Sequence, residues 1–500
     1  MFWLVVSFSL SREKVYFTSI NGEENNICSR ENPCSYKRII RVVKPFDRVE
    51  FLDNEISKTH ELEKVRILIN SLVSMEVKIN GNNMVINGSL YRPIDQFFIV
   101  SHHIGNVSLS QIVFSGFKTP VIAFQAVDNG VLTDIVFTQN HIMNCFCLVL
   151  ATISSVIFNN VNFTENSVCN ASLIFFSTTN FQGNRTLFER NFIEHDSSQT
   201  LFRCLNSNLD LMLWNIKSNS GHDGPLMYFD YRSIVYMTYC IIEDNHHPEI
   251  MICDGLGNFT FYQTKIRRNK GLFFEATQAT GVCLHESSFN NNYSGDEPMF
   301  YLPGSYFISS FSSKIKNNYG KVFVEQKGMK SYAVISDSYL AENTFNDAVF
   351  SSDSETTISV RNSIFSRNWG KQGVFIMSNA RLDVIGMHSI QQIEPVFNLS
   401  KASGTIFNSN FTNEFSSSLN IIESDILIFD TLFNSRQINK RLRKLGTGHQ
   451  SMSGSYFQKA IESYHSIIDS ISYFNLILTI IMIIMSSDSI LSMLRLILCF

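Results

Sequence analysis

The sequence is poor in charge and lacks the short motifs that mark common enzyme classes. Charged residues make up 17% of its 500 residues, below the ~25% usual in soluble domains. The net charge of −4 gives no cationic excess for binding nucleic acid. No Cys-x-x-Cys pair occurs, so zinc and thioredoxin-like interpretations have no support. Asp-x-Asp, Gly-x-Ser-x-Gly, Walker and dinucleotide-binding patterns are also missing, and we predict no metal site and no cofactor.

Helical repeats are excluded as well, because the middle of the chain contains no apolar period of helix length. Instead, an apolar residue followed three positions later by asparagine recurs at steps of 23 to 28 residues. Such a period is typical of repeat architectures, and it is too short for a propeller blade of ~40–45 residues. We therefore predict an all-β fold, a parallel β-helix of about a dozen coils. The asparagines of this ladder are Asn140, Asn166, Asn191, Asn219, Asn245, Asn269, Asn292, Asn318, Asn343 and Asn368.

Within each repeat, a short apolar burst such as 272–274 accompanies a segment of alternating polarity such as 358–365. This combination predicts about two strands per coil, with turns rich in asparagine, serine and glycine. We expect the ladder asparagine to adopt left-handed backbone angles at a corner and to bond along the axis. At 390–393, isoleucine is expected to replace the asparagine.

The two ends of the chain differ from the repeats. Residues 1–10 are apolar and are interpreted as a short signal peptide or a buried first strand. Residues 28–54 are predicted to form an N-terminal cap and first strand, with a helix over 36–44 that Ser35 caps. Cys28 and Cys34 are candidates for a disulfide in this region. The β-helix is assigned to 55–438, and a basic, flexible linker to 439–455.

The final segment, 456–500, drops the β pattern for apolar runs over 473–485 and 490–500. Neither run reaches the ~20 residues of a membrane span. Joining them places Asp488 at depth, at a cost of ~2.5–3.5 kcal/mol on insertion scales. The tail is interpreted as a C-terminal membrane anchor, with a helical cap or interfacial helix as the alternative.

Nine Asn-x-Ser/Thr sequons are consistent with a secretory route, although a chain rich in asparagine and serine produces many by chance. Asn292 is also a ladder residue and is expected to be too constrained to carry a glycan. The predicted glycosylation sites are Asn87, Asn106, Asn162, Asn170, Asn184, Asn258, Asn398 and Asn410.

Catalytic candidates are few. Asp223 follows His222, and Asp244 follows Glu243 one repeat later, so the two aspartates could lie on neighbouring coils. Both stand beside turn-forming residues, which favours solvated turn positions over a catalytic pair. The pairs at 102–103 and 246–247 are histidines, yet adjacent side chains on a strand face opposite sides and no carboxylate spacing supports a metal.

The rungs Phe137–Asn140, Phe163–Asn166, Phe188–Asn191, Phe289–Asn292 and Phe365–Asn368 resemble those of the polymorphic outer-membrane protein family and related surface proteins of protists. The opening 32–54 is also similar to the cap of pectin-lyase-like β-helices. These resemblances cover about 28–435 and imply a right-handed parallel β-helix at a cell surface, linked with adhesion. The family's Gly-Gly-Ala-Ile repeat and its C-terminal barrel are absent, which favours the anchored protist type.

The sequence thus leads to three hypotheses of function. The first is a non-enzymatic protein of the cell surface or membrane, structural or adhesive, with glycans or surface proteins as partners and the tail in the membrane. The second is a polysaccharide lyase or glycoside hydrolase on the same fold, which would need carboxylates converging in one groove. The third is an intracellular scaffold. Fold alone does not decide among them.

Overall fold

A computed structural model describes residues 13–91, 97–194, 200–230, 232–276, 278, 280–303, 307–327, 331–353, 355–392, 394–412 and 419–434. The chain divides into two compact units, Met1–Arg436 and Gln437–Phe500, and all described residues belong to the first. The predicted signal peptide (1–10), linker (439–455) and tail (456–500) lie outside the described residues. Within the described ranges, no helix has the length and apolar character needed to cross a membrane.

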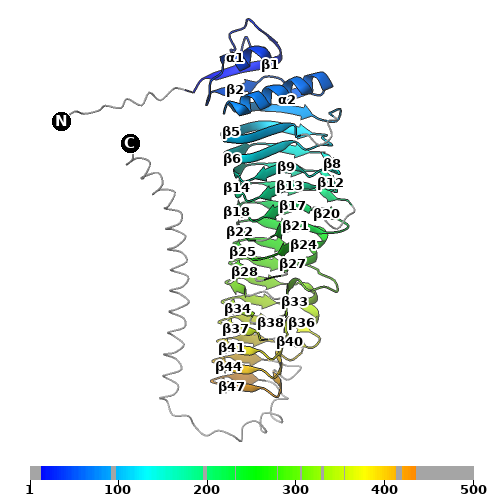
Figure 1. The fold of residues 1–500 in the computed structure, drawn as a ribbon. Coiled ribbons are helices and arrows are strands. Elements are labelled where there is room, and N and C mark those ends of the chain that lie inside the picture. The colour runs from blue at the N-terminus through cyan, green and yellow to red at the C-terminus, as the bar shows by residue number, and fades with distance from the viewer. Residues whose placement is uncertain are drawn as a thin grey trace, which may run out of the picture. The chain divides into compact units, whose positions relative to one another are not determined.

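The first unit is a right-handed parallel β-solenoid of about 13 coils (Figure 1). Each strand pairs in parallel with its counterparts one coil earlier and one coil later, as β13 does with β9 and β17. The coils therefore form three long sheets. Sheet 1 contains β9 (Cys147–Thr152), β13 (Ser172–Ser177), β17 (Thr200–Leu205), β21 (Pro225–Asp230), β24 (His246–Asp254), β27 (Lys270–Ala276), β30 (Phe300–Pro303), β33 (Tyr319–Lys327), β36 (Thr344–Ser352), β40 (Gly373–Ser378), β43 (Phe397–Ser400) and β46 (Leu419–Ile422).

Sheets 2 and 3 follow sheet 1 around each coil. Sheet 2 contains β10 (Ser155–Asn159), β14 (Asn180–Asn184), β18 (Asn208–Met212), β22 (Ser233–Thr238), β25 (Gly257–Tyr262), β28 (Thr280–His285), β31 (Phe307–Phe311), β34 (Tyr332–Ser336), β37 (Thr357–Arg361), β41 (Arg381–Ile385), β44 (Ser403–Phe407) and β47 (Asp425–Phe429). Sheet 3 contains β7 (Val136–Thr138), β11 (Asn162–Thr164), β15 (Leu187–Glu189), β19 (Asn215–Lys217), β23 (Ile241–Glu243), β26 (Lys265–Arg267), β29 (Ser288–Asn290), β32 (Lys314–Lys316), β35 (Tyr339–Ala341), β38 (Ile364–Ser366), β42 (His388–Ile390), β45 (Asn410–Thr412) and β48 (Leu432–Asn434).

A short fourth strand follows sheet 3 in some coils and is continuous with the sheet-1 strand in others. It is separate as β8 (His141–Met143), β12 (Ser167–Cys169), β16 (Phe192–Ile193), β20 (Ser220–Gly221) and β39 (Trp369–Gly370). Each coil thus holds three or four strands, so the expectation of about two was wrong. The corners permit this because a single left-handed residue turns the chain between short strands, as Thr178 and Arg185 do on either side of β14.

The N-terminal region precedes the regular coils and contains both helices of the described chain, with β1 (Val15–Glu23), β2 (Arg48–Phe51), β3 (Glu55–Ile56), β4 (Lys78–Asn87), β5 (Ile99–Ser115) and β6 (Ile122–Thr133). Helix α1 (Tyr36–Val42) begins where predicted, and the Ser35 side chain accepts a hydrogen bond from the Arg38 amide. Helix α2 (Thr59–Ser74) was not predicted. It packs on β4 and β5 at this end of the solenoid (Figure 1).

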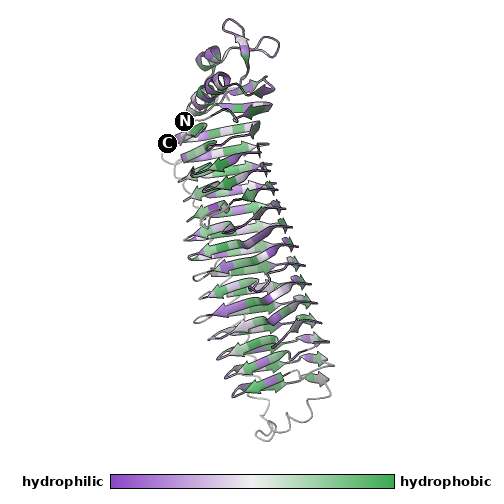
Figure 2. Ribbon diagram, turned by 90° about the vertical axis from the view of Figure 1, so that its right-hand side faces the viewer, coloured by the Kyte–Doolittle hydropathy of each residue, from purple (hydrophilic) through white to green (hydrophobic). Residues whose placement is uncertain are grey.

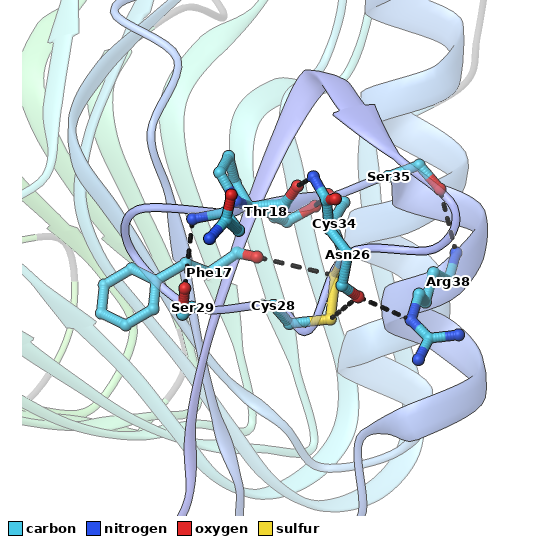
Figure 3. The surroundings of a disulfide bond; sticks show 10 residues. Phe17, Thr18, Asn26, Cys28, Ser29, Cys34, Ser35 and Arg38 are labelled. Atoms are coloured by element: carbon cyan, nitrogen blue, oxygen red, sulfur yellow. Dashed lines mark hydrogen bonds between the residues drawn. A yellow bond between two sulfur atoms is a disulfide. The ribbon is translucent and has the colours of Figure 1, made fainter.

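A disulfide joins Cys28 to Cys34 between β1 and α1 (Figure 3). The segment that carries this disulfide is hydrogen-bonded to both neighbouring elements. Thr18 Oγ1 donates to the Cys34 carbonyl oxygen at 3.0 Å, and Arg38 Nε donates to the Asn26 carbonyl oxygen at 2.8 Å. The crosslink therefore connects the first strand to the first helix.

The core runs along the solenoid axis, and apolar positions recur on the strands from coil to coil (Figure 2). The apolar residues of the repeated motif face inward. Because equivalent residues repeat at about the ~4.8 Å strand spacing, the rings of Phe137, Phe163 and Phe188 stack with successive centroids 4.8 Å apart.

The ladder asparagines are buried and hydrogen-bonded from coil to coil. In Asn245, the backbone N–H and Nδ2 both donate to Oδ1 of Asn269, at 3.2 and 2.9 Å, and Nδ2 also donates to the Ile216 carbonyl oxygen at 2.9 Å. The residue with left-handed angles is the one before the asparagine, as Asp244 (φ 56°) shows, so the expected left-handed asparagine was wrong. The asparagine side chain instead points into the solenoid, where its amide both accepts and donates hydrogen bonds at the corner.

The ladder ends on a glutamine and not on an isoleucine. Gln392 Oε1 accepts from the Asn368 backbone N–H at 2.8 Å, and Nε2 donates to the Phe365 carbonyl oxygen at 2.8 Å. The expectation of isoleucine at 393 missed the register by one residue. Glutamine, whose side chain is one methylene longer than that of asparagine, thus makes the same two kinds of hydrogen bond.

A second buried polar ladder joins sheets 2 and 3 and was not predicted. The Ser287 amide donates to Oγ of Ser313, the Ser313 amide to Oγ of Ser338, and the Ser338 amide to Oγ of Ser363, at 3.1 to 3.2 Å. Small hydroxyl side chains thus provide at this corner the acceptor that asparagine provides at the other.

Candidate functional site

The outward side of sheet 1 carries a column of side chains, one per coil, which are polar or aromatic except at Ile252. The register aligns Arg203 with Tyr228, then Ile252, Glu275, Tyr301 and Glu325. We call this surface, together with Glu249 and Glu297 beside it, the outer face. Its members point outward because their strand neighbours fill the core, as Met227 and Phe229 do on either side of Tyr228.

Aromatic rings and cations alternate along part of the outer face. The Arg203 guanidinium carbon lies 5.2 Å from the centre of the Tyr228 ring and 5.9 Å from that of Phe175. Farther along, Lys327 Nζ lies 5.5 Å from the centre of the Tyr301 ring and 2.7 Å from Glu325 Oε1. These contacts hold planar groups in place against the sheet.

Three carboxyl groups gather in the middle of the outer face. Burial raises the pKa of Glu249, and the charges of Glu275 and Glu297 raise it further. Burial likewise raises the pKa of Glu275, with Glu297 and Asp254 adding to the effect. Among the described residues, none of the three glutamates forms an ion pair within 4.0 Å that would offset this repulsion. Burial and mutual repulsion thus favour the protonated form of Glu249 and Glu275, and carboxyl oxygens can accept hydrogen bonds from a ligand.

Tyr228, a member of the column, is hydrogen-bonded to Asp254 at the end of β24. Its hydroxyl donates to Asp254 Oδ2 at 3.1 Å, and burial together with this bond raises its pKa to about 12. The tyrosine is therefore a neutral hydrogen-bonding group with one ring face directed along the column.

The two aspartates considered from the sequence lie elsewhere, and the fold does not bring them together. The register places Ser220 beside His246, so Asp244 lies two residues before that pair and Asp223 three residues after it. Asp244 is bound at a corner by Arg268, with Nε 2.7 Å from Oδ1, and this bond lowers its pKa. That arrangement is a surface ion pair on a turn.

The histidines and sequons are also placed by the structure. The His102 and His103 rings contact each other on the surface, and no group of three metal-binding side chains occurs in the described residues. Among the sequons, the side chains of Asn106, Asn170 and Asn258 are exposed, whereas Asn87, Asn162, Asn184, Asn398 and Asn410 are half-buried. Asn292 is buried in the ladder, bonded to Asn318.

Sequence reasoning missed the outer face because its residues stand inside bursts that look apolar. Glu275 follows Leu-Phe-Phe, and Tyr228 stands between Met227 and Phe229. The available signal was one position that aligns from burst to burst and is occupied by Phe175, Tyr228, Glu275 and Tyr301.

Comparison with known proteins adds distant likenesses. No protein-family model and no curated protein matches the chain, so the resemblance to polymorphic outer-membrane proteins stays a prediction. Among solved structures, pectate lyase Pel9A is 12% identical over 74% of this chain and 79% of its own, with a TM-score of 0.26. The tailspike protein of E. coli bacteriophage HK620, in complex with a pentasaccharide, is 9% identical over 83% and 78%, with a TM-score of 0.25. Likenesses at this level carry no argument here, and the β-helix rests on the strand register described above.

Proposed function

We propose that the protein binds carbohydrate along the outer face and works, without catalysis, as an adhesive or structural protein of a cell surface. The observation that carries this proposal is the register column of Tyr228, Glu275 and Tyr301. A saccharide has apolar C–H faces and a rim of hydroxyl groups. Tyrosine rings offer apolar area with a polar tip, and carboxyl oxygens accept hydrogen bonds from hydroxyl groups.

The flat, periodic form of the outer face supports a chain ligand over a compact one. Equivalent positions recur at about the ~4.8 Å strand spacing, so a linear polymer lying along the axis meets a new side chain at each coil.

The N-terminal segment, including α1 and α2, is proposed to cover the end of the solenoid and protect its edge strands.

An array of immobilised glycans tests the binding function. The wild-type chain is compared with the double variant Tyr228→Ala and Tyr301→Ala, and with Tyr332→Ala as a matched control. Tyr332 is 47% exposed and lies on sheet 2, away from the outer face. We expect glycan binding by the wild type and the control, and its loss in the double variant at an unchanged melting temperature. Absence of binding by the wild type to any glycan would reject the proposal.

A second candidate function is hydrolysis of a glycosidic bond by Glu249 and Glu275. The raised pKa values of both carboxyl groups favour it, because a glycosidase needs one protonated acid and one base or nucleophile. Release of reducing ends from bound polysaccharide measures it. If the chain is a hydrolase, Glu249→Gln and Glu275→Gln should each lower the rate by ~10²-fold or more. Binding without any release favours the adhesive function.

The surface location and the membrane tail are part of the proposal. Exposed sequons at Asn106, Asn170 and Asn258 are accessible to the glycosylation machinery. Treatment of the protein from its native cells with N-glycosidase should increase its gel mobility. An unchanged mobility would favour the intracellular scaffold instead.

A further inference from the structure

A pocket of about 300 Å³ opens at the edge of the outer face, at the start of sheet 1 in four successive coils. Its lining includes Gly221, His246, His247, Lys270, Tyr293 and Ser294. The register stacks His246 on Lys270 and Lys270 on Tyr293. The pocket adjoins the outer face directly, because Glu249 follows two residues after His247 in β24.

His247 is the buried polar group of the pocket. Its side chain is 3% exposed, and no side chain of another described residue is hydrogen-bonded to either ring nitrogen, so the ring interacts only with the backbone of Gly224 and Glu249. Buried polar atoms are nearly always hydrogen-bonded in folded proteins. The ring of His247 therefore forms part of the wall of the pocket and is satisfied by backbone groups, and the groups open to a ligand are the exposed ones around it.

Two glycines hold the His247 ring at this position. A Cβ on Gly221 would lie 2.1 Å from Nε2, so only glycine leaves room for the ring. A Cβ on Gly271, whose φ is +115°, would lie 1.7 Å from the His247 carbonyl oxygen. The backbone thus packs closely around the histidine and fixes the position of its ring.

The pocket is cationic, in contrast to the outer face beside it. The exposed Lys270 forms no ion pair with any described residue, and His246 is exposed next to it. Burial lowers the pKa of His247 to about 4, an effect that hydrogen bonds with the backbone of Gly224 and Glu249 and the nearby Asp223 carboxylate only partly offset. At neutral pH the ring is then uncharged, with one N–H donor and one acceptor, and Lys270 supplies the positive charge.

We infer that this pocket binds an anionic group, a carboxylate or a sulfate ester, on one unit of the saccharide held by the outer face. The inference rests on the proposed function. Lys270 pairs with the anion, and the exposed His246 lies beside it in the pocket. The volume stands at the lower end of the ~300–1,000 Å³ of small-molecule pockets, which suits a single sugar unit.

Calorimetric titration of the full-length protein tests the inference with matched oligosaccharides, one neutral and one with the same backbone bearing carboxylate or sulfate. The variant Lys270→Gln is compared with Lys265→Gln, an exposed lysine of β26 outside the pocket. We expect the wild type and Lys265→Gln to bind the acidic ligand about tenfold more tightly, the effect of one charge-assisted hydrogen bond. Lys270→Gln should lose that preference and keep its affinity for the neutral ligand.

The other outcomes separate this inference from the proposed function. The wild type could bind the two oligosaccharides equally, or Lys270→Gln could keep the preference for the acidic one. Either result would overturn the anion-binding role of the pocket without affecting the proposed saccharide binding by the outer face. Binding of inorganic sulfate without any saccharide would assign the pocket to a free anion and overturn the inference. Failure of every saccharide and of sulfate to bind would overturn both.

Discussion

Removing one asparagine from the middle of the ladder should destabilise the solenoid far more than removing one from its surface. The Asn245 side chain takes part in four buried hydrogen bonds. Nδ2 donates to Ile216 and Asn269, and Oδ1 accepts from the backbone N–H and Nδ2 of Asn219 at 3.1 and 2.9 Å. At ~1 kcal/mol for each bond, Asn245→Ala should lower the free energy of unfolding by about 4 kcal/mol.

Part of this loss comes from the Asn219 backbone N–H and Nδ2, which both stay buried without their acceptor on Asn245. The matched control is Asn208→Ala, because Asn208 is exposed and its Nδ2 makes a single bond of 3.3 Å to Asn180. We expect Asn208→Ala to lower the free energy of unfolding by less than ~0.5 kcal/mol. Urea unfolding measures both, with reversibility checked and the slope compared with that of the wild type.

Hydrogen exchange gives an independent reading of the same change, since the Asn219 amide should exchange faster in Asn245→Ala. A loss below ~1 kcal/mol, similar to the control, would refute the view that the buried amide ladder stabilises the corners.

Three further outcomes follow from particular contacts. Because burial and neighbouring carboxylates raise the pKa of Glu275, the folded chain binds this proton more tightly than the unfolded chain, and stability falls as the pH rises through that pKa. Glu275→Gln should therefore raise the melting temperature at neutral pH and leave it unchanged well below the ordinary value of 4.5. Replacing the disulfide-bonded Cys28 with serine should cost about 2 kcal/mol, the loop-closure value for so short a loop, measured by urea unfolding. Gly271→Ala should prevent folding because of its overlap with the His247 carbonyl, whereas Gly295→Ala, with the nearest atom at 3.9 Å, should yield folded protein by circular dichroism.

The architecture could be predicted because the repeat spacing alone determines which residues stack. Once the motif recurs every 23 to 28 residues, Phe137, Phe163 and Phe188 must occupy one column whatever the intervening turns do. The hydrogen bonding of the asparagines along the axis followed from the same spacing. The backbone angles of each asparagine did not, because the residue that turns the corner is the variable one before it, such as Gln139.

Two features of the structure, helix α2 and the outer face, could not be predicted from the repeat period alone. Helix α2 buries Leu62, Val65, Ile69 and Val73 at helical spacing, a signal that was present but stood before the regular ladder. The outer face depends on the register of sheet 1, since adjacent residues in an apolar burst face opposite sides. The position of Glu275 outside and Phe274 inside became evident only from the pairing with β30.

Carboxyl footprinting tests the location of the bound saccharide most directly. The full-length protein is labelled with a carbodiimide and an amine, with and without the oligosaccharide of highest array signal, and each modified glutamate is quantified by mass spectrometry. Glu286, an exposed corner residue outside the outer face, is the internal reference. The account predicts that the ligand protects Glu275 and Glu249 while labelling of Glu286 stays constant. Unchanged labelling of Glu275 under saturating ligand would contradict it and place the saccharide elsewhere on the solenoid.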